Sequence, residues 1–512
     1  MHIKPVHGDG DLICVILHAL EYENSDDHNG DNRRKDGIAL CKVHHALNIT
    51  FADACLFPAH ISLQSDRMHH RFSHIGDKNA SFCFSKRVSY FIMGALKIKG
   101  SDDMKYILVI GDGMADDPVP ELGGLTPLEY AKKPFIDELA AKGEVGNVLN
   151  VPDNLPAGSD TAIMSIFGCD PNLYYTGRAP LEAAATGIKL NPGDVAYRCN
   201  MVTYETGDMP FEEKRILSHS AGSIDGAVSD EIITELFNDP EFAALAAKAG
   251  MTVNLGHSFR HIAVQSQADI KGIRLIPPHD HLGEKIGPLL PTGCKNAEVL
   301  RELMVKANEL LEKSPVNAKL IAEGKMPANG IWFWAEGTAV KLPDFVAKNR
   351  HTGAVVSAVP LCHGIAALVG LGIVCPEGAT GEIDTNYENK MQATLDILED
   401  NDFAAVHVEA PDECTHNGDL KGKIQGIEWL DTRLISPMVK ELNERGWDFR
   451  MLFLSDHKTL TSTRGHAGGY VPYMLYDSRE SSGCGLPYTE KSGELGPQVN
   501  SGVSLMSMLF ER

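Results

Sequence analysis

The sequence lacks an excess of basic residues. It has 47 Lys and Arg against 69 Asp and Glu, which gives a formal net charge of −22 at pH 7. Nucleic acids and anionic membranes bind basic surfaces, so neither is expected as a partner. A small anionic substrate is compatible with this charge where bound metal ions or a few arginines reverse the local field. The hydrophobic content of 43% and charged content of 23% are typical of a folded protein, and 512 residues allow two to four domains.

Close cysteine pairs and long apolar runs are also absent. The 11 cysteines include no CxxC pair. No segment approaches the roughly 20 apolar residues that a membrane-spanning helix needs, and no signal peptide is visible after Met1. The sequence therefore predicts a reduced, cytoplasmic protein without a membrane partner.

Residues 1–103 differ in character from the rest of the chain. They hold ten of the 21 histidines and four of the cysteines, and no helical or strand period persists across them. Residues 36–45 faintly resemble the distal part of an HNH-type nuclease motif without its upstream half, and short motifs of this kind are often false positives. The density of His and Cys is compatible with metal binding, but no pair has zinc-finger spacing. We expect an extension of unknown role, either disordered or a mis-called start, with the functional enzyme beginning near Met104.

From Met104 onward, apolar strand-like runs alternate with helical patterns. Residues 106–110, 404–408 and 451–454 are typical of strands buried on both faces. Residues 134–142 and 425–445 have the apolar spacing of amphipathic helices. This alternation predicts an α/β protein with a mainly parallel sheet flanked by helices.

The middle of the chain reads as an inserted domain. It contains its own strands and helices and is interrupted by Pro- and Gly-rich pieces at 276–278 and 287–293. We predict that residues 104–185 and 362–512 form one domain and that residues 186–361 form the inserted α/β domain.

Acidic residues follow three of the predicted strands near the point where each ends. Asp112 follows the first strand, Asp412 lies a few residues beyond the second, and Asp456 follows the third. In an open α/β sheet, ligands gather beyond the carboxyl ends of the strands, so these segments are expected to meet at one edge. Each taken alone is typical of a turn or a surface polar contact. Together with three nearby histidines they match the ligands that divalent metals favour. The six candidate ligands are Asp112, Asp412, His416, Asp456, His457 and His466.

Ser159 is the candidate nucleophile. It lies in a short flexible turn, 155–161, before an apolar helix predicted at 162–167. One interpretation is an ordinary N-cap, whose hydroxyl accepts a backbone hydrogen bond. The other is an anion site at the positive end of the helix dipole, where a serine beside a metal ion could ionise and attack phosphorus. Free serine is a poor nucleophile at neutral pH, so the second interpretation requires the metal.

Several separated motifs, taken in order, carry a resemblance to a known family. The motifs are residues 111–116, 156–160, 174–183 and 410–419, followed by Asp456, His457 and His466. With these motifs the chain resembles the archaeal-type branch of cofactor-independent (2,3-bisphosphoglycerate-independent) phosphoglycerate mutases, within the alkaline phosphatase superfamily. The resemblance extends from Met104 to the C-terminus and leaves 1–103 unexplained.

The resemblance implies a phosphatase-like domain split by a substrate-handling domain, with two divalent ions, Mn²⁺ or Zn²⁺, and no bisphosphoglycerate cofactor. It also implies the interconversion of 3-phosphoglycerate and 2-phosphoglycerate, a reaction of glycolysis and gluconeogenesis, through a phosphoserine intermediate. Ser159 matches the phosphorylated nucleophile, which also contacts metal. The ligand set of one ion matches Asp112, Asp456 and His457, and that of the other matches Asp412, His416 and His466.

The substrate carries a phosphate and a carboxylate, so guanidinium groups are expected to bind it. Arg178 and Arg260 are the preferred candidates, and Lys390 is a further one; a surface or structural ion pair is the alternative for each. Ser223 occupies a place where relatives often carry a basic residue, so this sequence departs there from the family's pattern and a substrate contact at Ser223 is not predicted.

Three other functions share the same motifs. The first is a homoserine kinase-like phosphotransferase of the same branch, and the second is a metal-dependent phosphomonoesterase. The third, a non-catalytic binding protein, is disfavoured because every nucleophile and ligand position holds a chemically competent side chain.

Overall fold

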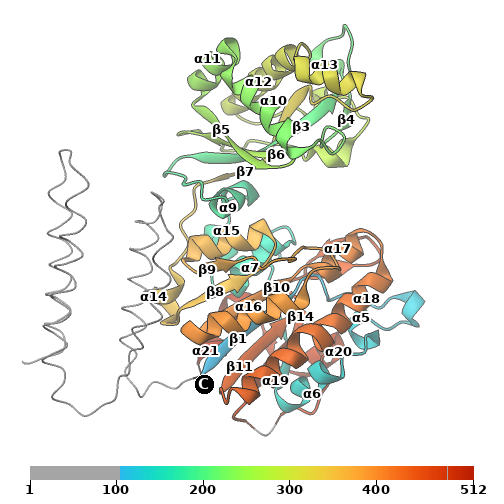
Figure 1. The fold of residues 1–512 in the computed structure, drawn as a ribbon, viewed down its shortest axis with the longest axis vertical. Helices are drawn as coiled ribbons and strands as arrows, with labels where there is room; N and C mark the ends of the chain where they lie inside the picture. The colour runs from blue at the N-terminus through green and yellow to red at the C-terminus, as the bar shows by residue number, and fades with distance from the viewer. Residues whose placement is uncertain (1–103, 481–482, 512) are drawn as a thin grey trace, which may run out of the picture. The chain divides into compact units, whose positions relative to one another are not determined.

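The computed structural model describes residues 104–480 and 483–511 (Figure 1). The predicted extension 1–103, with its nuclease-like segment at 36–45, lies outside the described residues. Within the described part of the chain, no helix combines the length and the apolar character that a bilayer crossing requires.

An eight-stranded, mainly parallel sheet forms the larger part of the fold. Its centre runs β11-β1-β10-β8-β9 with all neighbours parallel, and β14 is antiparallel to both β11 and β2. The predicted α/β fold and its mainly parallel sheet are confirmed. In sheet order the strands are β15 (Gln498–Val499), β2 (Glu144–Val148), β14 (Val471–Asp477), β11 (Phe449–Leu454), β1 (Lys105–Gly111), β10 (Phe403–Val408), β8 (Gly353–Val356) and β9 (Gly372–Val374).

Helices cover both faces of this sheet because the central strands are apolar on both sides. Ile107 and Val109 of β1 pack into one core, whereas Leu108 and Ile110 pack into the other. The first core includes α6 (Pro134–Lys142), α16 (Tyr387–Asp400), α18 (Leu420–Trp429) and α19 (Ser436–Glu444). The helix predicted at 134–142 is confirmed, whereas the stretch predicted as a helix at 425–445 consists of the end of α18, the π-helical segment Leu430–Ile435 and α19. The second core includes α7 (Ser159–Ile166), α14 (Phe345–Asn349), α15 (Pro360–Val369) and α21 (Leu505–Phe510).

A second, five-stranded sheet is built from the middle of the chain and is antiparallel throughout. Its strands are β3 (Val195–Tyr204), β4 (Ile216–Ser218), β5 (Met251–His257), β6 (Arg260–Gln265) and β7 (Gly330–Thr338). Its hydrophobic core also takes in α10 (Gly226–Asn238), α11 (Pro240–Ala249), α12 (Lys295–Leu311) and α13 (Pro315–Ala322).

The position of β8 bears on the predicted domain boundary. β8 pairs with β10 and β9 in the large sheet, although it lies within residues 186–361 that the sequence assigned to the inserted domain. A boundary before β8 therefore suits the sheet better than one at 361/362. β8 has only four residues and carries none of the site motifs, so no pattern marked it. The division into two domains stays a proposal.

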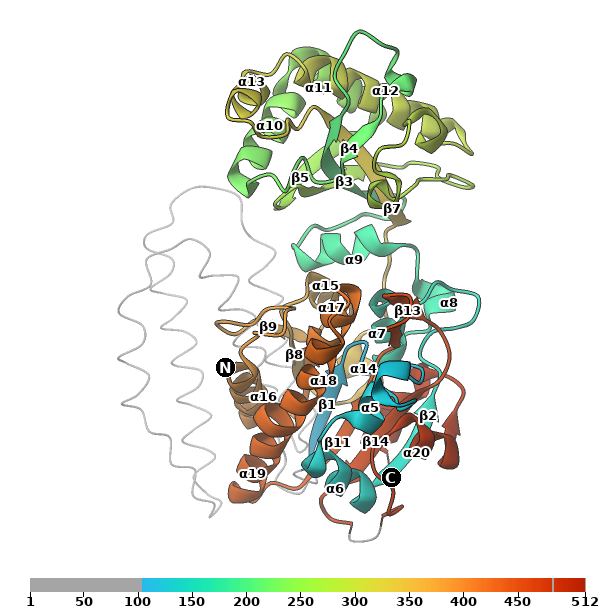
Figure 2. The ribbon, with the colours of Figure 1, turned by 90° about the vertical axis from the view of Figure 1, so that its right-hand side faces the viewer.

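Helix α9 (Arg178–Ala185) contacts elements of both sheets. It packs against α15 and against β3 and β7 (Figure 2). Thr176 Oγ1 donates a hydrogen bond to the carbonyl of Thr338 at 2.7 Å. Gly177, with φ +141°, lies so close to β7 that a Cβ atom there would sit 1.8 Å from the carbonyl oxygen of Glu336. Only glycine fits this approach, which places the first turn of α9 against β7.

Candidate metal and phosphoryl-transfer site

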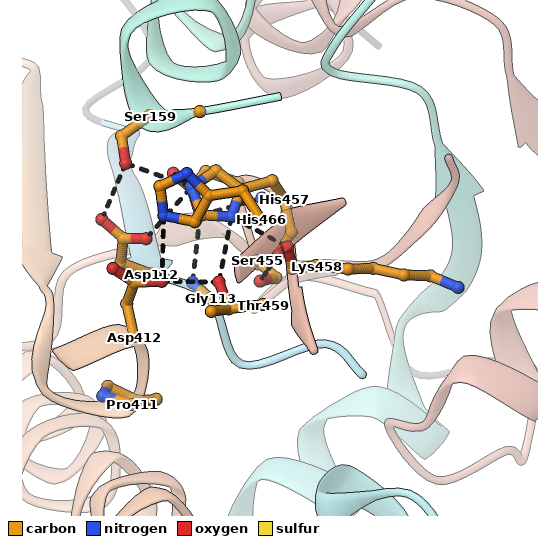
Figure 3. A network of polar contacts seen from close by, with 12 residues as sticks. Asp112, Gly113, Ser159, Pro411, Asp412, Ser455, His457, Lys458, Thr459 and His466 are labelled. Atoms are coloured by element: carbon orange, nitrogen blue, oxygen red, sulfur yellow. Dashed lines mark hydrogen bonds and ion pairs between the residues drawn. The ribbon is translucent and has the colours of Figure 1, made fainter. Parts of the chain in front are cut away.

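The predicted ligands come together at the carboxyl edge of the large sheet. β10 and β11 lie on either side of β1 and run parallel to it, so the three strands end at the same edge. Asp112 follows β1, α17 (Ala410–His416) follows β10, and Asp456 and His457 follow β11. His466 lies on the short strand β13 (Gly465–Ala467), which pairs with β12 (Lys458–Leu460) (Figure 3).

Asp112, Asp456 and His457 form the first cluster. Their ligand atoms lie within 4.8 Å of one another, and all three residues are buried. Neither Asp112 Oδ1 nor Asp456 Oδ2 has a hydrogen-bond partner among the described residues. Burial, and then the negative charge of Asp456, raises the pKa of Asp112. Buried carboxylate oxygens without donors are costly, and a divalent cation would satisfy them, so this donor set fits a metal ion.

Asp412, His416 and His466 form the second cluster. His416 Nε2 lies 3.1 Å from Asp412 Oδ2 and 2.9 Å from His466 Nε2. His416 Nδ1 lies 2.8 Å from the carbonyl oxygen of Arg464. That carbonyl can only accept, so Nδ1 carries the hydrogen and Nε2 is free to coordinate. When the ring is doubly protonated, Nε2 instead donates to Asp412, and this hydrogen bond raises the pKa of His416 to about 9. One carboxylate and two imidazole nitrogens also fit a divalent metal.

The two clusters adjoin each other through Gly113 and Thr459. The amide of Gly113 donates to Asp456 Oδ1 at 3.1 Å, and Thr459 Oγ1 donates to Asp412 Oδ1 at 2.5 Å. Gly113 has φ +60°, and a Cβ atom there would lie 2.5 Å from both Asp412 Oδ1 and Thr459 Oγ1. The backbone between the clusters therefore requires glycine.

Ser159 is the first residue of α7, and its hydroxyl points at the first cluster (Figure 3). Its Oγ lies 3.3 Å from Asp112 Oδ2 and 3.1 Å from His457 Nε2. The helix begins at Ser159 rather than at 162, and its N-cap is Gly158. The N-cap interpretation of Ser159 is therefore wrong, because the side chain turns to the carboxylate and imidazole instead of the backbone. Ser159 is half-buried.

His407 is a site residue that the sequence reasoning missed. It lies on β10, and its Nε2 is 2.9 Å from Asp112 Oδ2, with both side chains almost fully buried. Burial lowers the pKa of His407 to about 4. The available signal was an ionisable residue within an otherwise apolar strand. The contact itself follows from the pairing of β10 with β1, which no local pattern contains.

The predicted Arg178 shares the carboxylate of Glu182 with a second arginine. Arg178 Nε donates to Glu182 at 3.0 Å, and buried Arg198, which the sequence reasoning did not single out, donates to both oxygens of Glu182 through Nε and Nη2. Arg260 is exposed as a residue. The pKa of its guanidinium is nevertheless lowered, first by partial desolvation and then by the positive charge of Arg198. Three guanidinium groups therefore lie within electrostatic range of one another, and such groups suit an anionic substrate.

Lys390 does not lie where a substrate contact was predicted. Its side chain is fully buried, and its ammonium donates to the carbonyl oxygens of Thr380 and His407 at 3.2 Å each. Burial lowers its pKa to about 8. The correction has a simple cause: Lys390 lies on the face of α16 that packs against the sheet, so its ammonium is enclosed.

Comparisons with known proteins agree on one family. The family model described as 2,3-bisphosphoglycerate-independent phosphoglycerate mutase matches residues 140–317. A 2,3-bisphosphoglycerate-independent phosphoglycerate mutase of Methanosarcina barkeri is 41% identical over 394 residues, covering 77% of this chain and 96% of the relative. A probable enzyme of the same name from Geobacter sulfurreducens is 40% identical over 415 residues, covering 80% and 100%.

Two solved structures extend the comparison to the fold. The PH0037 protein from Pyrococcus horikoshii is 29% identical with a TM-score of 0.64, over 79% of this chain and 97% of that protein. The cofactor-independent phosphoglycerate mutase from Thermoplasma acidophilum is 25% identical with a TM-score of 0.54, over 79% and 99%.

Proposed function

This chain belongs to the family of 2,3-bisphosphoglycerate-independent phosphoglycerate mutases, which interconvert 3-phosphoglycerate and 2-phosphoglycerate, and we propose that Ser159 carries the phosphoryl group during that reaction. The observation that carries the proposal is the position of the Ser159 hydroxyl, within hydrogen-bond reach of both Asp112 and His457 at the start of a helix. Because the interconversion is a step of glycolysis, we also propose a cytoplasmic location.

Two divalent metal ions fit the two clusters. Ser159 would complete the set formed by Asp112, Asp456 and His457, and the second set is Asp412, His416 and His466. Bound ions at such a pair of sites neutralise phosphoryl oxygens and lower the pKa of a serine hydroxyl. The mixed oxygen and nitrogen donors suit Mn²⁺ or Zn²⁺, and we propose either as the native ion.

The side chains of this chain supply orientation and proton acceptance. The hydroxyl of Ser159 donates to Asp112 Oδ2, which leaves the oxygen lone pairs directed away from that carboxylate. In the forward transfer the bond from Ser159 Oγ to phosphorus forms while the bond from phosphorus to the glycerate oxygen breaks. The Ser159 proton passes to Asp112 Oδ2, which accepts its hydrogen bond, and the same proton is then delivered to the departing glycerate oxygen, so no proton is gained or lost. Attack by the other glycerate hydroxyl reverses these steps and restores Ser159.

Substrate binding calls for positive charge beside this hydroxyl. We propose that half-buried Arg178 and exposed Arg260 bind the anionic groups of phosphoglycerate, with Glu182 and buried Arg198 holding Arg178 in place. The glycerate must stay bound while it reorients, because water reaching the phosphoserine would release inorganic phosphate.

An assay of the full chain tests the proposal. Incubation with 3-phosphoglycerate and Mn²⁺, coupled to enolase and without added bisphosphoglycerate, is expected to yield 2-phosphoglycerate. Ser159→Ala should abolish turnover and phosphoenzyme formation, whereas Ser165→Ala, at a buried serine of the same helix, serves as the matched control. Undiminished turnover in Ser159→Ala would contradict the covalent mechanism.

The same samples separate the alternatives. Release of inorganic phosphate from 3-phosphoglycerate at the rate of substrate loss would identify a phosphomonoesterase. ATP-dependent phosphorylation of homoserine would identify a kinase-like phosphotransferase.

A further inference from the structure

The interior of the large sheet contains a histidine at a position that the metal clusters do not use. His407 is paired in register with Ile110 of β1, two residues before Asp112. Its side chain is 2% exposed, and its Nε2 lies 2.9 Å from Asp112 Oδ2. A polar ring inside an apolar sheet is unfavourable unless both of its nitrogens are satisfied. The structure satisfies both.

The direction of each hydrogen bond follows from the partners. Asp112 Oδ2 only accepts, so the hydrogen of His407 lies on Nε2. His407 Nδ1 then accepts from the hydroxyl of Ser357, whose Oγ is 3.2 Å away. Ser357 Oγ in turn accepts from the amide of Val359 at 3.0 Å. The donors therefore run in one direction, from the backbone through Ser357 and His407 to Asp112.

This arrangement gives the two carboxylate oxygens of Asp112 different surroundings. Oδ2 accepts from His407 and also from Ser159 at 3.3 Å, whereas Oδ1 has no hydrogen-bond partner among the described residues. A carboxylate held by one oxygen cannot rotate freely about its side-chain bonds. Its free oxygen is thus kept facing the cluster with Asp456 and His457.

We propose that His407 is a positioning residue that, with Ser357 behind it, fixes the Asp112 carboxylate so that Oδ1 faces a divalent cation and Oδ2 orients the hydroxyl of Ser159. The inference rests on the proposed function for the role of Ser159, but the effect on metal binding does not depend on it. Hydrogen bonds behind a metal ligand commonly contribute about 10- to 100-fold in metal affinity or activity.

The backbone around His407 supports a fixed ring rather than an adaptable one. The carbonyl oxygen of His407 accepts from Lys390 Nζ at 3.2 Å, and the carbonyl of Ser357 lies 2.8 Å from His363 Nε2. Both ends of the hydrogen-bonded series are therefore tied to neighbouring elements. The ring has little freedom to follow a displaced Asp112.

The test compares variants of the full chain by Mn²⁺ titration calorimetry after metal removal, together with kcat and KM for 3-phosphoglycerate at saturating Mn²⁺. His407→Leu removes the donor at similar volume, and His407→Gln retains an amide donor. The matched control is His261→Leu, because His261 is a fully buried strand histidine of the other sheet with its own serine partner, Ser229 at 2.9 Å.

We expect His407→Leu to weaken Mn²⁺ binding at one of two sites by about 10- to 100-fold and to lower kcat, with KM changed less than about twofold. His407→Gln should recover most of both losses, and His261→Leu should bind Mn²⁺ as the parent does. Parent-like Mn²⁺ affinity and kcat in His407→Leu would overturn the proposal.

If circular dichroism shows that His407→Leu does not fold, the Mn²⁺ affinity of Ser357→Ala tests the proposal instead. It deletes the next donor without removing the ring, so a weakening of Mn²⁺ binding in the same direction is expected, and unchanged affinity overturns the proposal. Activity that survives in Ser159→Ala would refute the phosphoserine mechanism alone, because Mn²⁺ affinity is read without turnover.

Discussion

The hydroxyl oxygen of Ser159 lies 3.1 Å from Nε2 of His457, although 298 positions separate the two residues in the chain. One is carried by the first turn of α7 and the other by the loop after β11. The same imidazole belongs to the cluster with Asp112 and Asp456. The proposed nucleophile and a candidate metal-ligand set therefore share one contact, which is what phosphoryl transfer to a serine requires.

Gly113→Ala should disrupt the joined clusters. Its Cβ would lie 2.5 Å from Asp412 Oδ1 and from Thr459 Oγ1, so the carboxylate must move. We expect at least about a tenfold loss of Mn²⁺ affinity, measured by calorimetry. Gly123→Ala is the matched control, because Gly123 has a similar φ of +71° but no neighbour within 4 Å of the added atom. Equal Mn²⁺ affinity in both variants would show that crowding at Gly113 is unimportant.

Removal of metal should lower stability as well as activity. Without a cation, Asp112 Oδ1 and Asp456 Oδ2 are buried without a hydrogen-bond partner, and burial together with the charge of Asp456 raises the pKa of Asp112. At a Mn²⁺ concentration 100 times Kd, the free energy of unfolding should rise by about 3 kcal/mol over the chelated enzyme. Denaturant melts with and without EDTA measure this. Asp456→Asn should lose much of the difference, and coincident melts of the parent would argue against metal binding.

Arg260→Ala should weaken substrate binding rather than folding. Arg260 is exposed and adds to the positive charge near Arg198 and Arg178. Loss of a charge-assisted hydrogen bond predicts a KM for 3-phosphoglycerate raised by about 10- to 100-fold. Arg215→Ala is the control, because Arg215 is also an exposed arginine of the middle part of the chain. Among the described residues, the hydrogen bond of its guanidinium goes to the carbonyl of Gly283. If Arg260→Ala has the same KM as the parent, Arg260 does not bind the substrate.

Lys390→Met should change the pH dependence of stability. Burial lowers the pKa of Lys390 from 10.5 to about 8 in the folded protein. Between pH 8 and pH 10.5 the unfolded chain binds more protons at Lys390 than the folded protein does, so the unfolding free energy of the parent rises with pH. Below pH 8 the folded protein must bury a charged ammonium, which lowers its unfolding free energy. The parent-minus-variant difference in unfolding free energy should therefore increase by about 3 kcal/mol from pH 8 to 10.5. Urea melts across this range measure the difference.

Lys440→Met is the control for that measurement. The Lys440 side chain is 77% exposed on α19, so its parent-minus-variant difference should stay flat. A flat difference for Lys390→Met as well would mean that the Lys390 ammonium is not buried in solution.

The sequence by itself determined the three central strands, the amphipathic helix at 134–142 and the identity of the clustered ligands. Apolar runs at 106–110, 404–408 and 451–454 specify buried strands because their side chains have no polar face to expose. Parallel strands of one sheet end at a common edge, so Asp112, Asp412 and Asp456 could be expected together before any coordinates. These are consequences of local periodicity and of one topological rule.

The tertiary structure alone decided the contacts that cross between elements. The direction of the Ser159 side chain, the burial of Lys390, and the hydrogen bond from His407 to Asp112 each depend on which strand neighbours which and in what register. A single residue carries no record of a partner that lies hundreds of positions away, because the contact energy arises only after the sheet has assembled.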